Sequence, residues 1–142
     1  MTARGLTQFT NPLEVLIGDP FVLQDGRTYY MYGTRNPGAG YEVFTSTDLV
    51  RWRWRGYCYR KSRSTYGRRD FWAPEVIRKG RKYYMFLITR RPPSHLRNIV
   101  VATSDSPLGP FTDATGPIFP TDRGVIDPHA FRDPATGKYY LY

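Results

Sequence analysis

The sequence has few of the features that mark disulfide-rich, membrane or secreted proteins. It contains one cysteine, Cys58, so no internal disulfide can form, and no metal-ligand spacing surrounds it. It has no apolar run of the about 18 residues that a membrane span needs. Segment 1–9 also lacks the apolar core of a secretory signal. We therefore expect Cys58 to fill the core or an edge, no contact with a membrane, and a cytoplasmic protein unless its true start lies upstream.

Aromatic and turn-forming residues are present in excess. Aromatic residues make up 16% of the chain, with 12 tyrosines, and glycine (13) and proline (12) together account for 25 of 142 residues. Aromatic residues favour strands, whereas glycine and proline favour turns. No amphipathic helix of useful length is visible. The composition predicts an all-β domain of short strands, and it also suits a sugar-binding surface.

The positive charge is concentrated in one stretch. The net charge is +9, and segment 51–69 contains eight basic residues and no acid, with Trp52, Trp54, Tyr57 and Tyr59 between them. A basic strip with interleaved aromatic residues is one form of single-stranded nucleic-acid site. The other interpretation is a strand with arginines outward and tryptophans inward, followed by a basic loop. We favour the strand, so nucleic acid is disfavoured as a partner.

Three copies of one pattern organise the chain. Pro20, Pro74 and Pro128 are spaced 54 residues apart, and each begins a short apolar stretch, then a glycine-containing turn, then an aromatic stretch. The first two turns contain Asp25-Gly26 and Lys79-Gly80, and the third is two residues longer. Paired stretches of this kind predict β-hairpins.

Two further strands are predicted after each of the first two hairpins. The third strands are expected at 41–46 and 98–103, and the outer strands at 51–57 and from Phe111 onward. Four antiparallel strands every 40–55 residues or so is the pattern of β-propeller blades. The sequence therefore predicts a propeller.

The period divides the chain into blades at about 15–60 and 70–115, with the start of a third at about 123–142. About two and a half blades cannot close a propeller, which needs at least four or so. Strand edges would be left bare, so we expect this segment alone to be unstable or prone to association.

Two aspartates occupy the same position of the repeat. Asp19, Ala73 and Asp127 each precede the proline at the head of an inner strand. Inner strands line the channel of a propeller, so both carboxylates are expected to face one pocket. Cleavage of a glycosidic bond needs such a pair, because one group activates water or attacks carbon while another protonates the leaving oxygen. Phe71 and Trp72 are candidates to stack on a sugar ring.

The motifs around these residues resemble glycoside hydrolase family 43. They follow one another with fitting separations, as Gly18-Asp19-Pro20-Phe21, Phe71-Trp72-Ala73-Pro74-Glu75-Val76, Ser104-Asp105-Ser106-Pro107-Leu108-Gly109-Pro110-Phe111 and Ile126-Asp127-Pro128. The resemblance implies a five-bladed β-propeller that cleaves arabinose- or xylose-containing glycans with inversion. The implied partners are arabinan, arabinoxylan or xylo-oligosaccharides. It also implies that Asp19 is the general base, that Asp127 raises the pKa of the general acid and orients it, and that Trp72 forms part of the sugar subsite.

The general acid that the resemblance implies is a glutamate on the fourth blade. One period past Asp127 falls near position 181, beyond the 142 residues. Glu75 lies two residues past Ala73, and we expect it to make a local hydrogen bond to a neighbouring blade or loop instead. The fragment is therefore expected to be inactive.

The third hairpin carries further candidates. His129 follows Asp127-Pro128 and is a candidate sugar contact, although a packed strand histidine is the commoner arrangement. Segment 131–134 is similar to a motif of invertase and fructosidase propellers, but its Asp133 falls in the hairpin turn, so we interpret it as turn chemistry.

No cofactor and no metal ligand is expected from these residues. Some members of the family hold a structural calcium ion, but through later blades. The alternative to an enzyme is a propeller that binds carbohydrate without cleaving it.

The missing acid gives a direct test. The purified 142-residue chain is expected to leave nitrophenyl arabinofuranoside and nitrophenyl xyloside unhydrolysed, because no residue can protonate the leaving oxygen. Release of nitrophenol, followed by absorbance, measures this. Turnover above a buffer control would show that an acid is already present in the chain.

Overall fold

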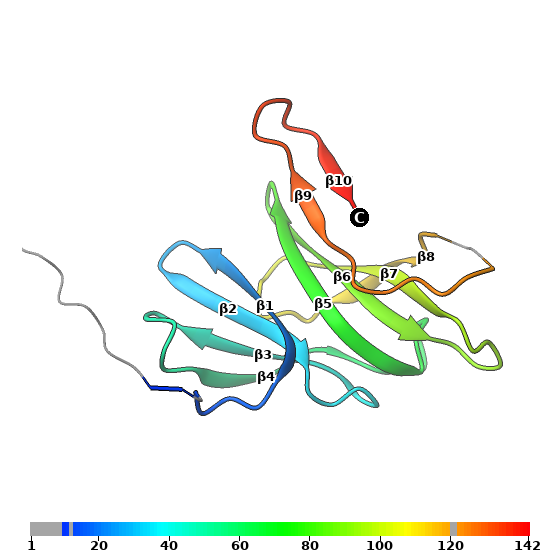
Figure 1. Cartoon of the computed structure of the whole chain (residues 1–142), viewed down its shortest axis with the longest axis horizontal. Coiled ribbons are helices and arrows are strands. Elements are labelled where there is room, and N and C mark those ends of the chain that lie inside the picture. The colour runs from blue at the N-terminus through cyan, green and yellow to red at the C-terminus, as the bar shows by residue number, and fades with distance from the viewer. Residues whose placement is uncertain (1–9, 12, 120–121) are drawn as a thin grey trace, which may run out of the picture.

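The computed structural model describes residues 10–11, 13–119 and 122–142, and the regular structure of these residues consists of β-strands (Figure 1). The first four strands form one antiparallel sheet in the order β1-β2-β3-β4, and the next four form a second in the order β5-β6-β7-β8. β9 and β10 form a hairpin. The strands are β1 (Gly18–Asp25), β2 (Thr28–Thr34), β3 (Gly40–Ser46), β4 (Arg53–Arg60), β5 (Arg69–Lys79), β6 (Lys82–Arg90), β7 (Arg97–Ser104), β8 (Thr112–Pro117), β9 (Ala130–Arg132) and β10 (Tyr139–Leu141).

The predicted repeat is confirmed. Each four-stranded sheet is a blade whose strands follow one another in space as in sequence, and the hairpin is the first half of a third. The turn glycines Gly26, Gly80 and Gly137 all have positive φ, at +59°, +63° and +70°. Only glycine adopts this backbone without steric cost. The fold is all-β and is that of the five-bladed β-propeller, of which about two and a half blades are present.

No helix of membrane-spanning length and hydropathy occurs among the described residues.

The first outer strand differs from its prediction. β4 begins at Arg53 rather than at residue 51, and the side chain of Trp54 is 55% exposed instead of inward. Trp54 pairs with Phe44, on the face of the sheet opposite to Val43. The prediction of inward tryptophans was therefore wrong at this position, because Trp54 faces away from the second sheet.

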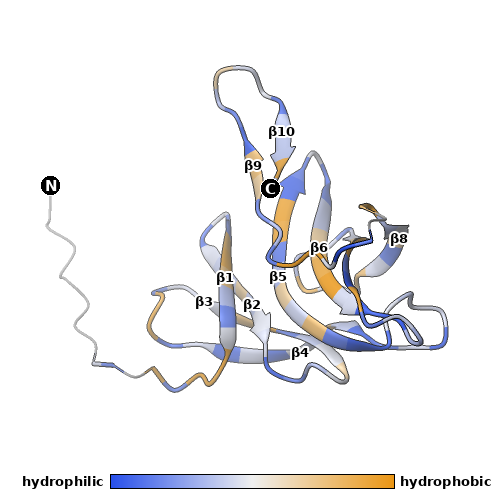
Figure 2. Cartoon of the chain, turned by 45° about the vertical axis from the view of Figure 1, so that its right-hand side comes forward, coloured by the Kyte–Doolittle hydropathy of each residue, from blue (hydrophilic) through white to orange (hydrophobic). Residues whose placement is uncertain are grey.

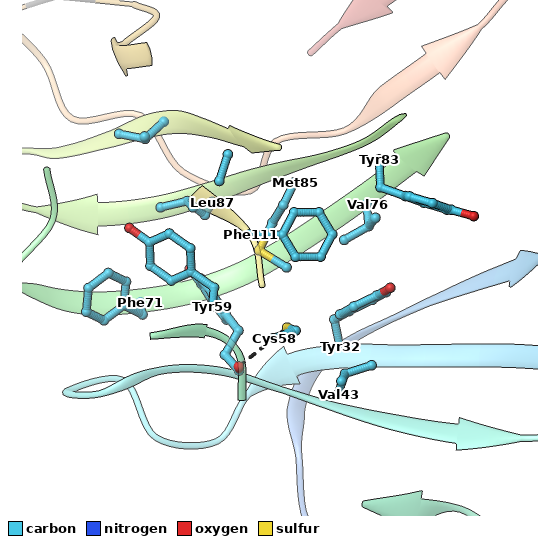
Figure 3. Close-up of a cluster of buried hydrophobic side chains, with 13 residues drawn as sticks. Tyr32, Val43, Cys58, Tyr59, Phe71, Val76, Tyr83, Met85, Leu87 and Phe111 are labelled. Atoms are coloured by element: carbon cyan, nitrogen blue, oxygen red, sulfur yellow. Dashed lines mark hydrogen bonds between the residues drawn. The ribbon is translucent and has the colours of Figure 1, made fainter. Parts of the chain in front are cut away.

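The core lies between the two blades and is largely aromatic (Figure 3). Tyr32, Tyr41 and Tyr59 come from the first blade, and Phe71 and Phe111 come from the second. The Phe71 ring lies 5.9 Å from that of Tyr41 and 5.7 Å from that of Tyr59, and Tyr32 meets Phe111 edge-on at 6.5 Å. Such pairs add to the free energy gained by burial.

Each of these three tyrosines also makes a polar contact with the second blade. The hydroxyl of Tyr32 donates to the backbone carbonyl of Pro107 at 2.6 Å, and that of Tyr59 donates to Asp113 Oδ1 at 2.8 Å. The hydroxyl of Tyr41 reaches a backbone carbonyl of β6 at 3.0 Å. Buried hydroxyls that are satisfied in this way fix how one blade sits against the other. Cys58 is buried beside them, as predicted.

The third hairpin stands away from the two sheets (Figure 1). β6 has a continuous apolar stretch over 85–88, and β5 has charged residues at both ends with mostly apolar residues between them (Figure 2). In contrast, the hairpin exposes Phe131, Tyr139 and Tyr140 at 43%, 37% and 43%. Exposed aromatic side chains at a sheet edge favour association.

The buried hydroxyls and thiol make stability sensitive to alkali. Burial raises the pKa of Tyr32, Tyr41 and Tyr59 above the ordinary value of 10.0, and that of Cys58 above 9.0. The unfolded chain therefore loses these protons first as pH rises. The stabilisation is fully present below about pH 9 and is lost progressively at higher pH.

We expect the melting temperature to stay level up to about pH 9 and to fall steeply beyond pH 10. Circular dichroism during heating at pH 7–11 measures this. Cys58→Ala should remove the part of the decline that begins at the lowest pH. Tyr142→Phe is the control, because Tyr142 is 74% exposed, and it should leave the dependence of melting temperature on pH unchanged. A melting temperature independent of pH up to 11 would contradict the assignment.

Candidate active site

The residue before the proline of each repeat has the same unusual backbone. φ is +48° at Asp19, +37° at Ala73 and +56° at Asp127, one 54-residue period apart. β1 and β5 each contain one extra residue relative to the partner strand, over 18–21 and 72–75. Such a β-bulge re-aims a side chain that regular alternation would direct elsewhere. Bulges therefore occur around Asp19 and Ala73, and Asp127 shares their positive φ.

Aspartate and alanine tolerate this backbone differently. Aspartate enters the left-handed region more readily than most residues, whereas for alanine it costs roughly 1–2 kcal/mol. The backbone N–H of Ala73 donates to Thr34 Oγ1 at 2.9 Å, which links the strained residue to the first blade. At the equivalent positions, Asp19 and Asp127 tolerate the positive φ and also provide a carboxylate for the channel.

The two aspartates reach a common concavity. It has a volume of about 290 Å³ and is lined by both of them and by Ala73, Glu75 and the neighbouring prolines. Asp19 and Asp127 come from strands 108 residues apart in sequence. The predicted convergence of the two carboxylates is thus confirmed, while their catalytic roles remain predictions.

Thr34 at the end of β2 holds the Asp19 carboxylate. Its hydroxyl donates to Asp19 Oδ2 at 2.7 Å while it accepts from the Ala73 N–H. Among the described residues, no hydrogen bond is made to Asp19 Oδ1, so this oxygen remains available to water. The sequence did not indicate Thr34, because the residue one period later is Ile88 and the repeat carries no signal there.

Glu75 joins the second blade to the third hairpin. Its side chain is 8% exposed, Oε1 accepts from the Ala130 N–H at 2.8 Å, and Oε2 lies 3.0 Å from Nδ1 of His129. The prediction of a local hydrogen bond to a neighbouring blade is confirmed. The His129 side chain is 64% exposed, so its predicted sugar contact stays a prediction.

The predicted role of Phe71 was wrong. Its side chain is 0% exposed and belongs to the core between the blades, where it cannot contact a sugar. A second bulge in β5, between Arg69 and Trp72, alters the alternation of side chains along the strand. A bulge of this kind cannot be recognised from sequence periodicity. Both Phe71 and Trp72 were therefore predicted to contact a sugar.

Trp72 is half-buried and does not line the concavity. The guanidinium of Arg97 lies 4.0 Å above the centre of its ring, a close cation–π contact. Asp70 pairs with Arg97 at 3.3 Å and with Arg90 at 2.8 Å. These charges hold the indole beside the concavity, and its role in a sugar subsite stays a prediction.

Asp133 lies in the turn of the third hairpin, where its carboxylate binds neighbouring residues of the same turn. Asp133 Oδ1 accepts from the Ala135 N–H at 2.8 Å, and its Oδ2 accepts from the Thr136 hydroxyl at 2.5 Å. The Thr136 bond is the main cause that lowers the pKa of Asp133. The interpretation as turn chemistry is confirmed.

Across the described parts of the chain, no three His, Cys, Asp or Glu side chains are grouped closely enough to hold a metal ion.

Comparison with known proteins agrees with the fold. The Glycosyl hydrolases family 43 profile matches residues 9–142. A "Xylosidase/arabinosidase" of Bacteroides ovatus is 30% identical over 126 residues, which cover 88% of this chain and 33% of that protein.

Two solved structures superpose closely. A thermostable family-43 glycoside hydrolase is 38% identical with a TM-score of 0.86, covering 94% of this chain and 44% of that one. An endo-arabinase from Bacteroides thetaiotaomicron VPI-5482 is 32% identical with a TM-score of 0.81, covering 95% and 48%. The chain thus spans a third to a half of the length of these relatives. It belongs to glycosyl hydrolases family 43.

Proposed function

We propose that the protein is a glycoside hydrolase that cleaves arabinose- or xylose-containing glycans with inversion at the anomeric carbon. The observation that carries the proposal is the placement of Asp19 and Asp127 in one concavity at the channel ends of two different blades. The family supports the reaction class, and the names of the relatives, a xylosidase/arabinosidase and an endo-arabinase, support the sugars.

Asp19 acts as the general base in this proposal. A carboxylate that activates water needs one oxygen fixed and the other directed at the water. The Thr34 hydroxyl engages Oδ2, so Oδ1 accepts the proton of the attacking water. Water attacks the anomeric carbon, the bond to the leaving oxygen breaks, and that oxygen takes a proton from a general acid.

Asp127 is the partner carboxylate that orients the acid. Glu75 is unsuited to be that acid, because one oxygen accepts a backbone N–H and the other faces His129. None of the described residues is assigned as the proton donor. Arabinan, arabinoxylan and xylo-oligosaccharides are the proposed substrates.

A chimera tests the site within a complete propeller. Residues 9–142 would replace the matching 44% of the thermostable relative, whose remaining portion supplies the other blades. The chimera is expected to hydrolyse nitrophenyl arabinofuranoside or xyloside, and NMR of the first-formed sugar should show the inverted anomer. Asp19→Asn keeps a residue that tolerates positive φ and should lower kcat by about 10²–10⁴-fold.

Asp105→Asn is the matched control, since the Asp105 side chain is 83% exposed and remote from the concavity. Equal turnover of the Asp19→Asn and Asp105→Asn chimeras would contradict the assignment of the base. Tight binding of oligosaccharide by a folded chimera that shows no turnover would favour a carbohydrate-binding propeller instead.

Thr34 offers a second test in the same chimera. Thr34→Val removes the donor to Asp19 while keeping the shape of the side chain, so kcat should fall by about 10–100-fold with little change in KM. Thr34→Ser keeps the hydroxyl and should restore most of kcat. If valine and serine gave the same kcat, Thr34 would have only a packing role.

A further inference from the structure

A second cavity lies at the opposite ends of the strands from the two aspartates. It has a volume of about 610 Å³, within the usual range for small-ligand sites. Thr28 at the start of β2, Ser46 at the end of β3 and Arg53 at the start of β4 line it, and Leu108 from the second blade closes one side. Along β2, Thr28 in this cavity and Thr34 beside Asp19 are roughly 20 Å apart.

Three arginines and one carboxylate line this cavity. Arg51, Arg53 and Arg55 line it together with Asp48. Within the described residues, neither Arg53 nor Arg55 has an ion-pair partner or an acceptor. Their guanidinium groups therefore stay available to an anion.

Asp48 is already committed to its own loop. Its Oδ1 accepts from the backbone N–H of Val50 at 2.9 Å and of Arg51 at 2.8 Å, and its Oδ2 meets the Arg51 guanidinium at 3.3 Å. The bond from the Arg51 N–H is the main cause that lowers the pKa of Asp48, so it stays charged. The same bonds hold the loop in one shape, and the cavity keeps a net positive charge.

An aromatic surface completes the cavity. Trp52 lines it, and its Nε1 donates to the Leu49 carbonyl at 3.1 Å, so the plane of the indole is set before any ligand arrives. Tyr30 lies on the same lining and packs against the interblade core. A fixed aromatic face suits the apolar face of a sugar ring, and ordering it in advance lowers the entropy cost of binding.

The basic stretch does not form a continuous track for nucleic acid. Arg68 donates to backbone carbonyls of Ser62 and Arg63, and Arg60 lies 5.1 Å over the ring of Tyr57. These guanidinium groups are occupied within the protein and lie outside the cavity lining. A bounded cavity with arginines and an aromatic wall suits a short anionic saccharide better than a polynucleotide strand.

We propose that this cavity binds a saccharide bearing a carboxylate, with Trp52 against a sugar ring and the Arg53 and Arg55 guanidinium groups on the carboxylate. The choice of a saccharide rests on the proposed function, whereas the preference for an anion rests on the cavity alone. The site is separate from the hydrolytic concavity and tethers acidic side groups of a polysaccharide to the opposite end of the blades.

Isothermal titration calorimetry with the 142-residue chain tests this. The probes are xylotriose carrying one glucuronic acid and unsubstituted xylotriose. Binding of the acidic probe should be at least about tenfold tighter, and Arg53→Gln with Arg55→Gln should lower its affinity by about tenfold or more. Arg53→Lys should lose part of the affinity, because it keeps the charge but not the planar fork.

Arg81→Gln, at an exposed turn, is the matched control, and melting curves verify that every variant is folded. The preference for the acidic probe over unsubstituted xylotriose should persist in Asp19→Asn, because Asp19 does not line this cavity. A failure of the hydrolase proposal would therefore leave the outcome of this test unchanged. Equal affinity for both probes, or an affinity unchanged by the paired glutamines, would overturn the proposal. Tighter binding of a DNA oligonucleotide with steep salt dependence would overturn it in favour of nucleic acid.

Discussion

Three tyrosines that cross from the first blade to the second set the geometry on which everything else depends. Tyr32, Tyr41 and Tyr59 are at most 1% exposed, yet each hydroxyl finds an acceptor in the second blade. Apolar burial alone would let the sheets slide, because it has no direction. Directional hydrogen bonds at the ring tips fix the angle between the blades, and that angle determines where their inner strands point.

With the blades fixed, local backbone chemistry at the strand heads decides what faces the channel. A residue with positive φ precedes the proline of each repeat, and at two of these positions it is an aspartate, Asp19 or Asp127, that lines the same concavity. The blades also share the support of this site. Thr34 from the first blade binds Asp19 and the backbone of Ala73, and Glu75 from the second binds the third hairpin. The site is therefore built across blade boundaries.

The two cavities differ in what the chain provides. The concavity of Asp19 and Asp127 has carboxylates and suits proton transfer. The cavity of Arg53, Arg55 and Trp52 has guanidinium groups and a fixed indole and suits ligand recognition. Antiparallel strands separate them naturally, since neighbouring strand ends lie at opposite rims of a blade. The proposed hydrolysis and the proposed binding of an acidic saccharide therefore use different ends of the same blades.

The fold could be predicted because the sequence repeats every 54 residues. Pro20, Pro74 and Pro128 and the turn glycines repeat, and a repeat needs no knowledge of distant contacts to be seen. The pairing of Asp19 with Asp127 followed from the same periodicity. Glu75 was also predicted correctly as a local link, since its position next to the channel head left it near a neighbouring blade.

Features that do not recur in each repeat could not be predicted in this way. Phe71 was taken for a sugar contact and is a core residue, because an unseen bulge altered the alternation of β5. Thr34 was missed because its counterpart in the repeat is apolar. Local propensity and spacing were enough to predict the strands, the turns and the shared repeat position of the two aspartates. Which side chains reach the concavity and which are buried depends on bulges and interblade contacts, because these join residues that no local sequence pattern connects.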